Sequence, residues 1–148
     1  MDIHSESYLL LLFVATLFVA SCGKRQTTLC SADGERCITI EDRLNTRMIY
    51  FESGAGVNYV ELDISKVDLE TEGLFICWRN ESGKMEVVSP KTSILDQSYD
   101  TSLYEFDNKF KEDERGRPDI KYFHKEGCLE YNIMSNSVFP RKHAKIKK

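Results

Sequence analysis

Short apolar segments separated by turn residues fill the chain from residue 26 to residue 89. The segments are rich in β-branched and aromatic residues, which favour strands, and no window of this stretch keeps a helical period over three turns. Turn residues such as Asp33-Gly34 and those at 53–56 and 80–83 separate them. The expected strands cover residues 38–40, 48–51, 59–65, 74–78 and 85–88. The pattern therefore predicts an all-β fold, built as an antiparallel sandwich or barrel.

Residues 59–65 alternate between apolar and polar side chains. Val60, Leu62 and Ile64 are apolar, and the residues between them are polar. Successive side chains of a strand point to opposite faces, so these three are expected to face the core together. After the polar connection at 70–73, a second strand places Phe75 and Cys77 on a common face.

From Pro90 onward the apolar pattern loosens. Residues 108–125 form a highly charged tract, and residues 141–148 contain five Lys or Arg. Aromatic residues remain frequent, which is not typical of a wholly disordered segment. We expect residues 91–148 to form a less regular C-terminal extension, which either packs on the domain at 26–90 or begins an incomplete second module.

The first 22 residues read as an export signal. Residues 8–20 are apolar except for Thr16, and this run is too short to span a bilayer, which takes roughly 20 apolar residues. It ends in the small residues Ala20 and Ser21, which favours cleavage there. The chain is therefore expected to be secreted, or held at the cell surface if the segment is retained. Residues 19–22 also resemble a lipobox that would lipidate Cys22, although the preceding residues lack Lys and Arg.

Removal of residues 1–22 changes the formal charge only slightly. It deletes Asp2 and Glu6 and no base, so the charge moves from −4 to −2 over the remaining 126 residues. This balance gives no reason to expect a polyanionic partner for the whole domain, and nucleic acid is not expected as a partner. The remaining length is sufficient for one domain with its own core.

The cysteines are expected to form disulfides, because an exported chain meets an oxidising compartment. No Cys-x-x-Cys or paired-histidine spacing suggests a metal, and no cofactor is expected. The sequence also lacks a Gly-x-Ser-x-Gly motif and a phosphate-binding loop. These features predict binding rather than catalysis.

Residues 62–77 resemble strands E and F of the immunoglobulin superfamily, whose pattern is L-x-I-x-x-V-x-x-x-D-x-G-x-Y-x-C. The matching positions are Leu62, Ile64, Val67, Gly73 and Cys77, and the resemblance extends over about residues 47–88. Phe75 stands in place of the family's tyrosine. Thr71 replaces the aspartate that commonly pairs with an arginine such as Arg47, and Trp78 follows the strand F cysteine instead of lying on strand C.

The resemblance implies an immunoglobulin-like antiparallel sandwich that works as a recognition or adhesion module for a protein partner. It also implies an inter-sheet disulfide between Cys30 and Cys77, which would contribute about 4 kcal/mol by loop closure. Cys37 and Cys128 are then the candidates for a second bridge. Other pairings of these four cysteines remain open.

The same resemblance suggests where a partner would bind. If Phe75 and Cys77 point inward, the outward side chains of this strand form a large apolar row, which favours a contact surface. That row consists of Leu74, Ile76 and Trp78. The alternative is that the chain after Pro90 covers it. Asn80-Glu81-Ser82 is a glycosylation sequon in the expected turn after this strand.

Two further interpretations concern the C-terminal region. The basic end could bind sulfated glycans or an anionic surface, or it could be a solvated tail. A second functional hypothesis is a β-trefoil ligand that binds a receptor and heparin. It rests on a faint similarity of residues 73–77, 83–84 and 116–118 to fibroblast growth factors.

Overall fold

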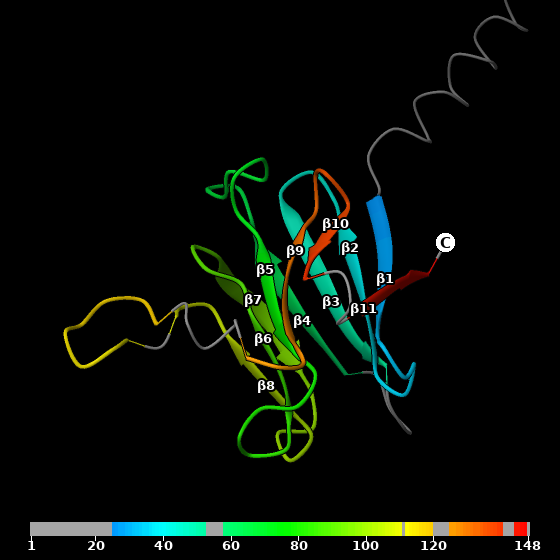
Figure 1. Cartoon of the computed structure of the whole chain (residues 1–148). Helices are drawn as coiled ribbons and strands as arrows, with labels where there is room; N and C mark the ends of the chain where they lie inside the picture. The colour runs from blue at the N-terminus through cyan, green and yellow to red at the C-terminus, as the bar shows by residue number, and fades with distance from the viewer. Residues whose placement is uncertain (1–24, 53–57, 111, 120–124, 141–143, 148) are drawn as a thin grey trace, which may run out of the picture.

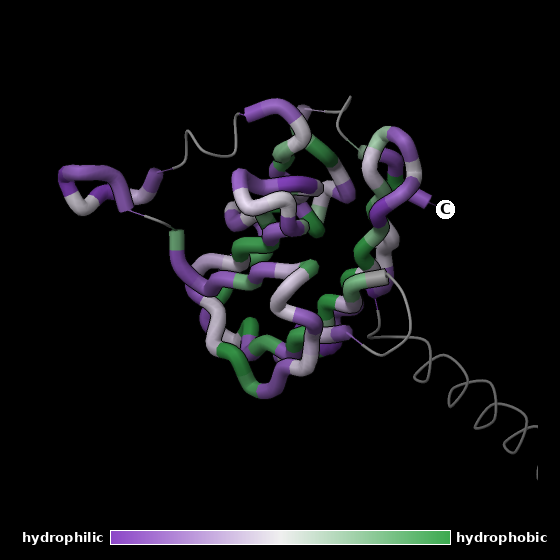
Figure 2. Tube along the Cα trace, turned by 90° about the horizontal axis from the view of Figure 1, so that it is seen from below, coloured by the Kyte–Doolittle hydropathy of each residue, from purple (hydrophilic) through white to green (hydrophobic). Residues whose placement is uncertain are grey.

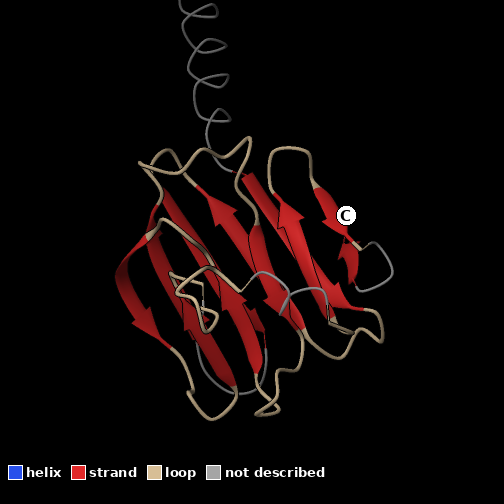
Figure 3. Ribbon diagram, turned by 60° about the vertical axis from the view of Figure 1, so that its left-hand side comes forward, coloured by secondary structure: helices blue, strands red, loops and turns tan. Residues whose placement is uncertain are grey.

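The computed structural model describes residues 25–52, 58–110, 112–119, 125–140 and 144–147, and these residues form an all-β sandwich (Figure 1). The expected export signal at 1–22 and Cys22 lie outside the described residues. The described residues contain eleven strands, which form two stacked sheets (Figure 3). No helix able to cross a bilayer occurs in the part of the chain that the structure describes.

The first sheet contains six strands in the order β11-β1-β2-β3-β4-β7. All of its neighbouring strands are antiparallel. The strands are β1 (Arg25–Ser31), β2 (Cys37–Asp42), β3 (Thr46–Glu52), β4 (Asn58–Asp63), β7 (Ser93–Ser98) and β11 (Ala144–Lys147).

The second sheet contains five strands in the order β10-β9-β5-β6-β8. Its β6 and β8 run parallel, and its other pairs are antiparallel. The strands are β5 (Leu74–Cys77), β6 (Met85–Val88), β8 (Tyr104–Asp107), β9 (Cys128–Asn132) and β10 (Ser137–Phe139).

The core lies between the two sheets. Val60, Leu62 and Ile64 are at most 4% exposed and belong to the same cluster, which confirms the expected core-facing row. Burial of such side chains is the main favourable contribution to folding, at roughly 1.5–3 kcal/mol each. The five strands expected between residues 38 and 88 are all present as β2 to β6.

Arg47 is buried in this sandwich at 2% exposure and is paired with Asp42. Its Nε donates to Asp42 Oδ1 at 2.8 Å, and its Nη2 donates to Oδ2 at 3.1 Å. The two residues face each other across β2 and β3. A neighbouring strand therefore supplies the carboxylate that Thr71 does not, and the two parallel hydrogen bonds offset the desolvation of both charges.

The structure corrects the expected disulfides. Cys30 is bonded to Cys37, and Cys77 is bonded to Cys128. In each bridge the two cysteines lie directly opposite one another on neighbouring strands of one sheet, with Cα atoms 4.1 and 4.0 Å apart. The expected Cys30–Cys77 and Cys37–Cys128 bridges, which would have joined the two sheets, are therefore wrong.

The chain after Pro90 is part of the same sandwich. It supplies β7 and β11 to the first sheet and β8, β9 and β10 to the second. Residues 144–147 of the basic end belong to this arrangement, because β11 pairs with β1 and its Ala144 and Ile146 pack against the core. Residues 112–119 form a turn that extends from the body, and Figure 2 shows it as mostly hydrophilic.

Candidate functional site

The apolar row proposed from the sequence is not a surface. Leu74 and Ile76 are fully buried, Trp78 is 6% exposed, and all three belong to the core between the sheets. Phe75 and Cys77 point the other way, onto the outer face of the second sheet. The residues at 74–78 are apolar on both faces of the strand, so the alternation could not decide which face is inward. The partner-binding assignment of these residues is therefore wrong.

The outer face of β5 is apolar because other parts of the chain pack on it. The Phe75 ring contacts the Phe110 ring edge-on, with centroids 4.9 Å apart. Beside them, the Cys77–Cys128 bridge and Val88 form a small buried cluster. The chain after Pro90 thus packs on Phe75 and Cys77, whereas the alternative stated above was that it covers the row at residues 74, 76 and 78.

A pocket of about 260 Å³ opens at one end of the sandwich. It lies where three connections meet, which join β1 to β2, β5 to β6, and β7 to β8. Loops held on a rigid sheet scaffold are common positions for binding residues. The pocket is lined by Glu35, Arg36, Arg79, Gly83, Met85, Leu103 and Tyr104.

Tyr104 forms the inner wall of the pocket. Its side chain is 3% exposed, and its ring stacks on Phe51 with centroids 4.6 Å apart. Its hydroxyl is buried and has no hydrogen-bond partner among the described residues. Burial raises the pKa of this hydroxyl, the nearby Arg36 guanidinium opposes the shift, and Asp100 adds to it. The group is therefore a neutral O–H at physiological pH, with a hydrogen available to donate.

Two arginines give the pocket a positive character. Arg36 Nη1 donates to the carbonyl oxygen of Trp78, which ties its guanidinium to the end of β5. Arg79 is exposed on the following loop. Within the described ranges, neither arginine forms an ion pair, and Glu35 is the single acidic residue of the lining.

The loop that carries Arg79 has a fixed shape. Asn80 Oδ1 accepts hydrogen bonds from the backbone N–H groups of Ser82 and Lys84 at 2.9 and 3.0 Å. Gly83 has a φ of 78°, in the left-handed region that glycine adopts without strain. These contacts place the loop beside Leu103, whose side chain is 50% exposed, and Met85, which is buried.

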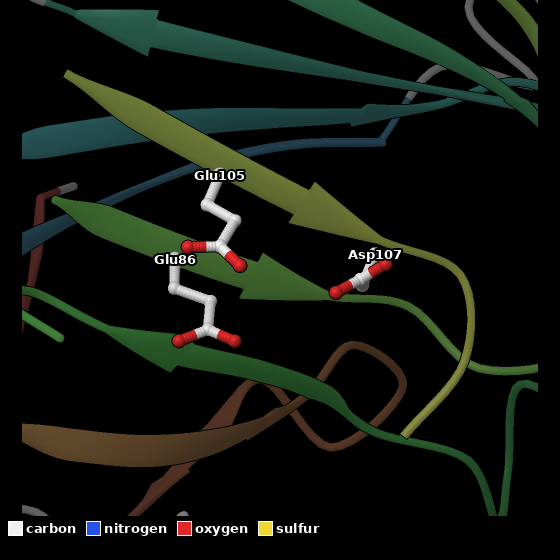
Figure 4. A group of neighbouring side chains, drawn as sticks. All are labelled: Glu86, Glu105 and Asp107. Carbon is white, nitrogen blue, oxygen red and sulfur yellow. The ribbon is translucent and has the colours of Figure 1, made fainter. Parts of the chain in front are cut away.

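A second group of side chains lies on the other face of β6 and β8. Glu86, Glu105 and Asp107 bring their carboxylate oxygens within 4.8 Å of one another, and Glu86 is fully buried (Figure 4). Such oxygens are ligands of the kind that calcium and magnesium prefer. An acidic cluster alone does not define a metal site, because carboxylates also gather without an ion.

Asn80 connects this cluster to the pocket loop. Its Nδ2 donates to Glu105 Oε2 at 2.8 Å and to Glu86 Oε2 at 3.3 Å. An N-linked glycan would take one of the two hydrogens on this nitrogen, so it would break one of these bonds. Glycosylation at Asn80 remains a prediction that the arrangement of its amide makes costly.

Neither the pocket nor the cluster is predicted by the sequence. The pocket combines Arg36 and Arg79 from two separate loops with Tyr104 from the start of β8, and no local pattern relates them. The cluster depends on the parallel pairing of β6 with β8, in which Glu86 lies opposite Glu105. The only trace of the cluster in the sequence is that acidic residues interrupt two short segments, Glu86 at 85–88 and Glu105 and Asp107 at 104–107.

Comparison of the chain with protein-family models, with curated proteins and with solved structures gives no match. Membership of the immunoglobulin superfamily stays a prediction.

Proposed function

We propose that the protein is an exported recognition module that binds a protein partner through the end of its sandwich at which the pocket opens. The observation that carries this proposal is the pocket between Arg36, Arg79 and Tyr104. It combines a buried polar group, two cationic side chains and the half-exposed Leu103 in one concavity. Binding sites commonly place a few convergent polar groups among apolar walls in this way.

Export is supported by two features of the chain. Two disulfides in one small domain are typical of proteins that fold in an oxidising compartment. The apolar run at residues 8–20 is typical of an export signal. The proposed location is therefore extracellular, either secreted or at the cell surface.

The size of the pocket favours a macromolecular partner. At about 260 Å³ it lies just below the roughly 300 Å³ at which pockets begin to enclose a whole drug-sized ligand. A concavity of this size suits one inserted side chain or chain end, surrounded by further contacts on the loops. Interfaces between proteins commonly obtain most of their binding energy from a few such anchors.

The growth-factor alternative loses its structural basis. The described strands form a two-layer sandwich rather than a trefoil. Lys145 and Lys147 of the basic end are exposed on β11, so binding of sulfated glycans stays a secondary prediction.

The proposal can be tested with secreted protein that has been made multivalent and applied to cells that each display one extracellular protein. We expect Leu103→Arg to abolish binding to the partner found with the unmodified protein. Leu44→Arg is the matched control, because Leu44 is 90% exposed and follows β2, whereas the pocket residue Arg36 precedes β2. Loss of binding in the Leu44 variant alone, or in neither variant, would overturn the proposal.

A further inference from the structure

We propose that the pocket binds a carboxylate joined to an apolar group, held by Arg36, Arg79 and the hydroxyl of Tyr104. This inference deepens the proposed function and rests on it, since it names the chemistry that this end of the sandwich recognises. Such a group is found in small organic acids and at the end of a polypeptide chain whose last residue is apolar.

The charge of the pocket selects an anion. Two guanidinium groups and one carboxylate line it, so its formal charge is positive. Arginine is the side chain best suited to a carboxylate, because its N–H donors match the two oxygens of that group. The described contacts of Arg36 use one of its five N–H donors, on the Trp78 carbonyl oxygen. The remaining donors can hold a second acceptor.

The hydroxyl of Tyr104 is the independent observation that points to a ligand. A buried hydroxyl without a hydrogen bond costs roughly 1–3 kcal/mol, so folded proteins rarely leave one in that state. Tyr104 lines the pocket, its residue is 97% buried, and its hydroxyl has no hydrogen-bond partner among the described residues. A carboxylate oxygen beside it would accept its hydrogen and remove that cost.

The apolar residues of the lining indicate which kind of group is joined to the carboxylate. Met85 and Leu103 line the pocket together with Tyr104, and the Tyr104 ring stacks on Phe51. A fully hydrated anion would gain nothing from these surfaces. A carboxylate that carries a short aliphatic or aromatic group would bury that group against them. Inorganic phosphate lacks such a group, and Glu35 would repel its second charge.

The test uses the full secreted chain and calorimetric titration with defined probes. N-acetyl-leucine is compared with its amide, N-acetyl-leucinamide, and with inorganic phosphate. We expect the acid to bind at least tenfold more tightly than either of the others. Equal binding of acid and amide, or tighter binding of phosphate, would overturn the inference.

Variants of the lining residues test whether N-acetyl-leucine binds in this pocket. Tyr104→Phe and Arg79→Gln are each expected to weaken the acid about tenfold, the equivalent of one hydrogen bond. Arg115→Gln is the matched control, since Arg115 is an exposed arginine of the 112–119 turn, outside the pocket lining. Tyr104→Phe is expected to fold normally, so weaker binding reports the missing hydroxyl. Unchanged affinity in both pocket variants would overturn the inference.

A leucine-ended peptide of about ten residues identifies the source of the carboxylate. Tighter binding of the peptide than of N-acetyl-leucine, lost when its end is amidated, supports the inference with a polypeptide end as ligand. Equal binding supports it with a free acid as ligand. If partner binding requires Leu103 but no carboxylate probe binds, this inference fails alone. If the acid binds while Leu103→Arg leaves partner binding intact, the proposed function fails alone.

Discussion

The parallel pair of β6 and β8 presents two different chemical surfaces on its two faces. Met85 and Tyr104 point inward and line the pocket, whereas their chain neighbours Glu86 and Glu105 point outward into the carboxylate cluster. One residue of displacement along a strand thus separates a cationic pocket from an acidic cluster.

The two surfaces differ in how their polar groups are satisfied. On the outer face, the Asn80 amide donates to two carboxylates and ties the cluster to the 79–84 loop. In the pocket, the described contacts leave the Tyr104 hydroxyl without a partner. The cluster therefore contributes to the shape of the loop, while the pocket keeps a buried donor that has no partner among the described residues.

The two disulfides lie in different sheets, and removing them separately is expected to give the largest difference in stability. The Cys77–Cys128 bridge lies on the outer face of the second sheet and spans a sequence separation of 51 residues. The Cys30–Cys37 bridge encloses the loop that carries Arg36 and spans a separation of seven. Loop-closure entropy assigns about 4 kcal/mol of stability to the first and about 2 kcal/mol to the second. Urea unfolding of the two paired Cys→Ala variants measures this. Equal losses, or a larger loss for the 30–37 pair, would contradict the pairing.

Breaking the link between the cluster and the pocket loop is expected to have the next largest effect. Asn80→Ala removes two hydrogen bonds to carboxylates and two that fix the loop, so we expect a loss of about 2 kcal/mol. Ser82→Ala is the control, because it destroys the sequon while leaving the Asn80 side chain in place. If both variants lose the same stability, the missing glycan rather than the missing amide is responsible.

On the pocket side, removing a polar group is expected to stabilise the protein. Tyr104→Phe deletes the buried hydroxyl and keeps the ring that stacks on Phe51, so the unliganded protein should gain about 1 kcal/mol. Thermal unfolding without added acid measures this. A clear loss of stability would show that the hydroxyl already has a structural partner.

The smallest expected effect concerns alkaline pH. Burial raises the pKa of Tyr104 above its ordinary value in the folded protein. The folded state then keeps a proton that the unfolded chain releases above a pH of about 10. The contribution of this hydroxyl to the free energy of unfolding is therefore fully present below pH 10 and is lost as the pH rises further. Tyr131, which burial shifts in the same direction, adds to the trend. Tyr104→Phe should flatten the decline above pH 10, and an unchanged slope would argue against a shifted Tyr104.

The sequence allowed the central strands to be predicted because their signals are local. The alternation of Val60, Leu62 and Ile64 and the turn glycines required no knowledge of distant partners. By contrast, β7 (Ser93–Ser98) is exposed along its whole length, so it carries no apolar alternation that a pattern could reveal. Its place in the sheet comes from pairing with β4.

The candidate site depended on information that is not local. Which face of β5 points away from the core depends on two residues far along the chain. Phe110 contacts Phe75, and Cys128 is bonded to Cys77. The immunoglobulin pattern assumed an inter-sheet bridge, and that assumption inverted the strand. Gly73 has a different role from the one the pattern gave it, since a Cβ there would lie 2.5 Å from the Glu130 carboxylate.

The most direct test of the binding pocket follows the arginine side chains themselves. In protein labelled with nitrogen-15 at arginine, the Nε–H signals of Arg36 and Arg79 are recorded while N-acetyl-leucine is added, and each is assigned from its Arg→Gln variant. We expect both signals to shift together and to saturate, while the signal of Arg115 stays in place. Stationary Arg36 and Arg79 signals at saturating acid, or equal shifts with N-acetyl-leucinamide, would contradict the account.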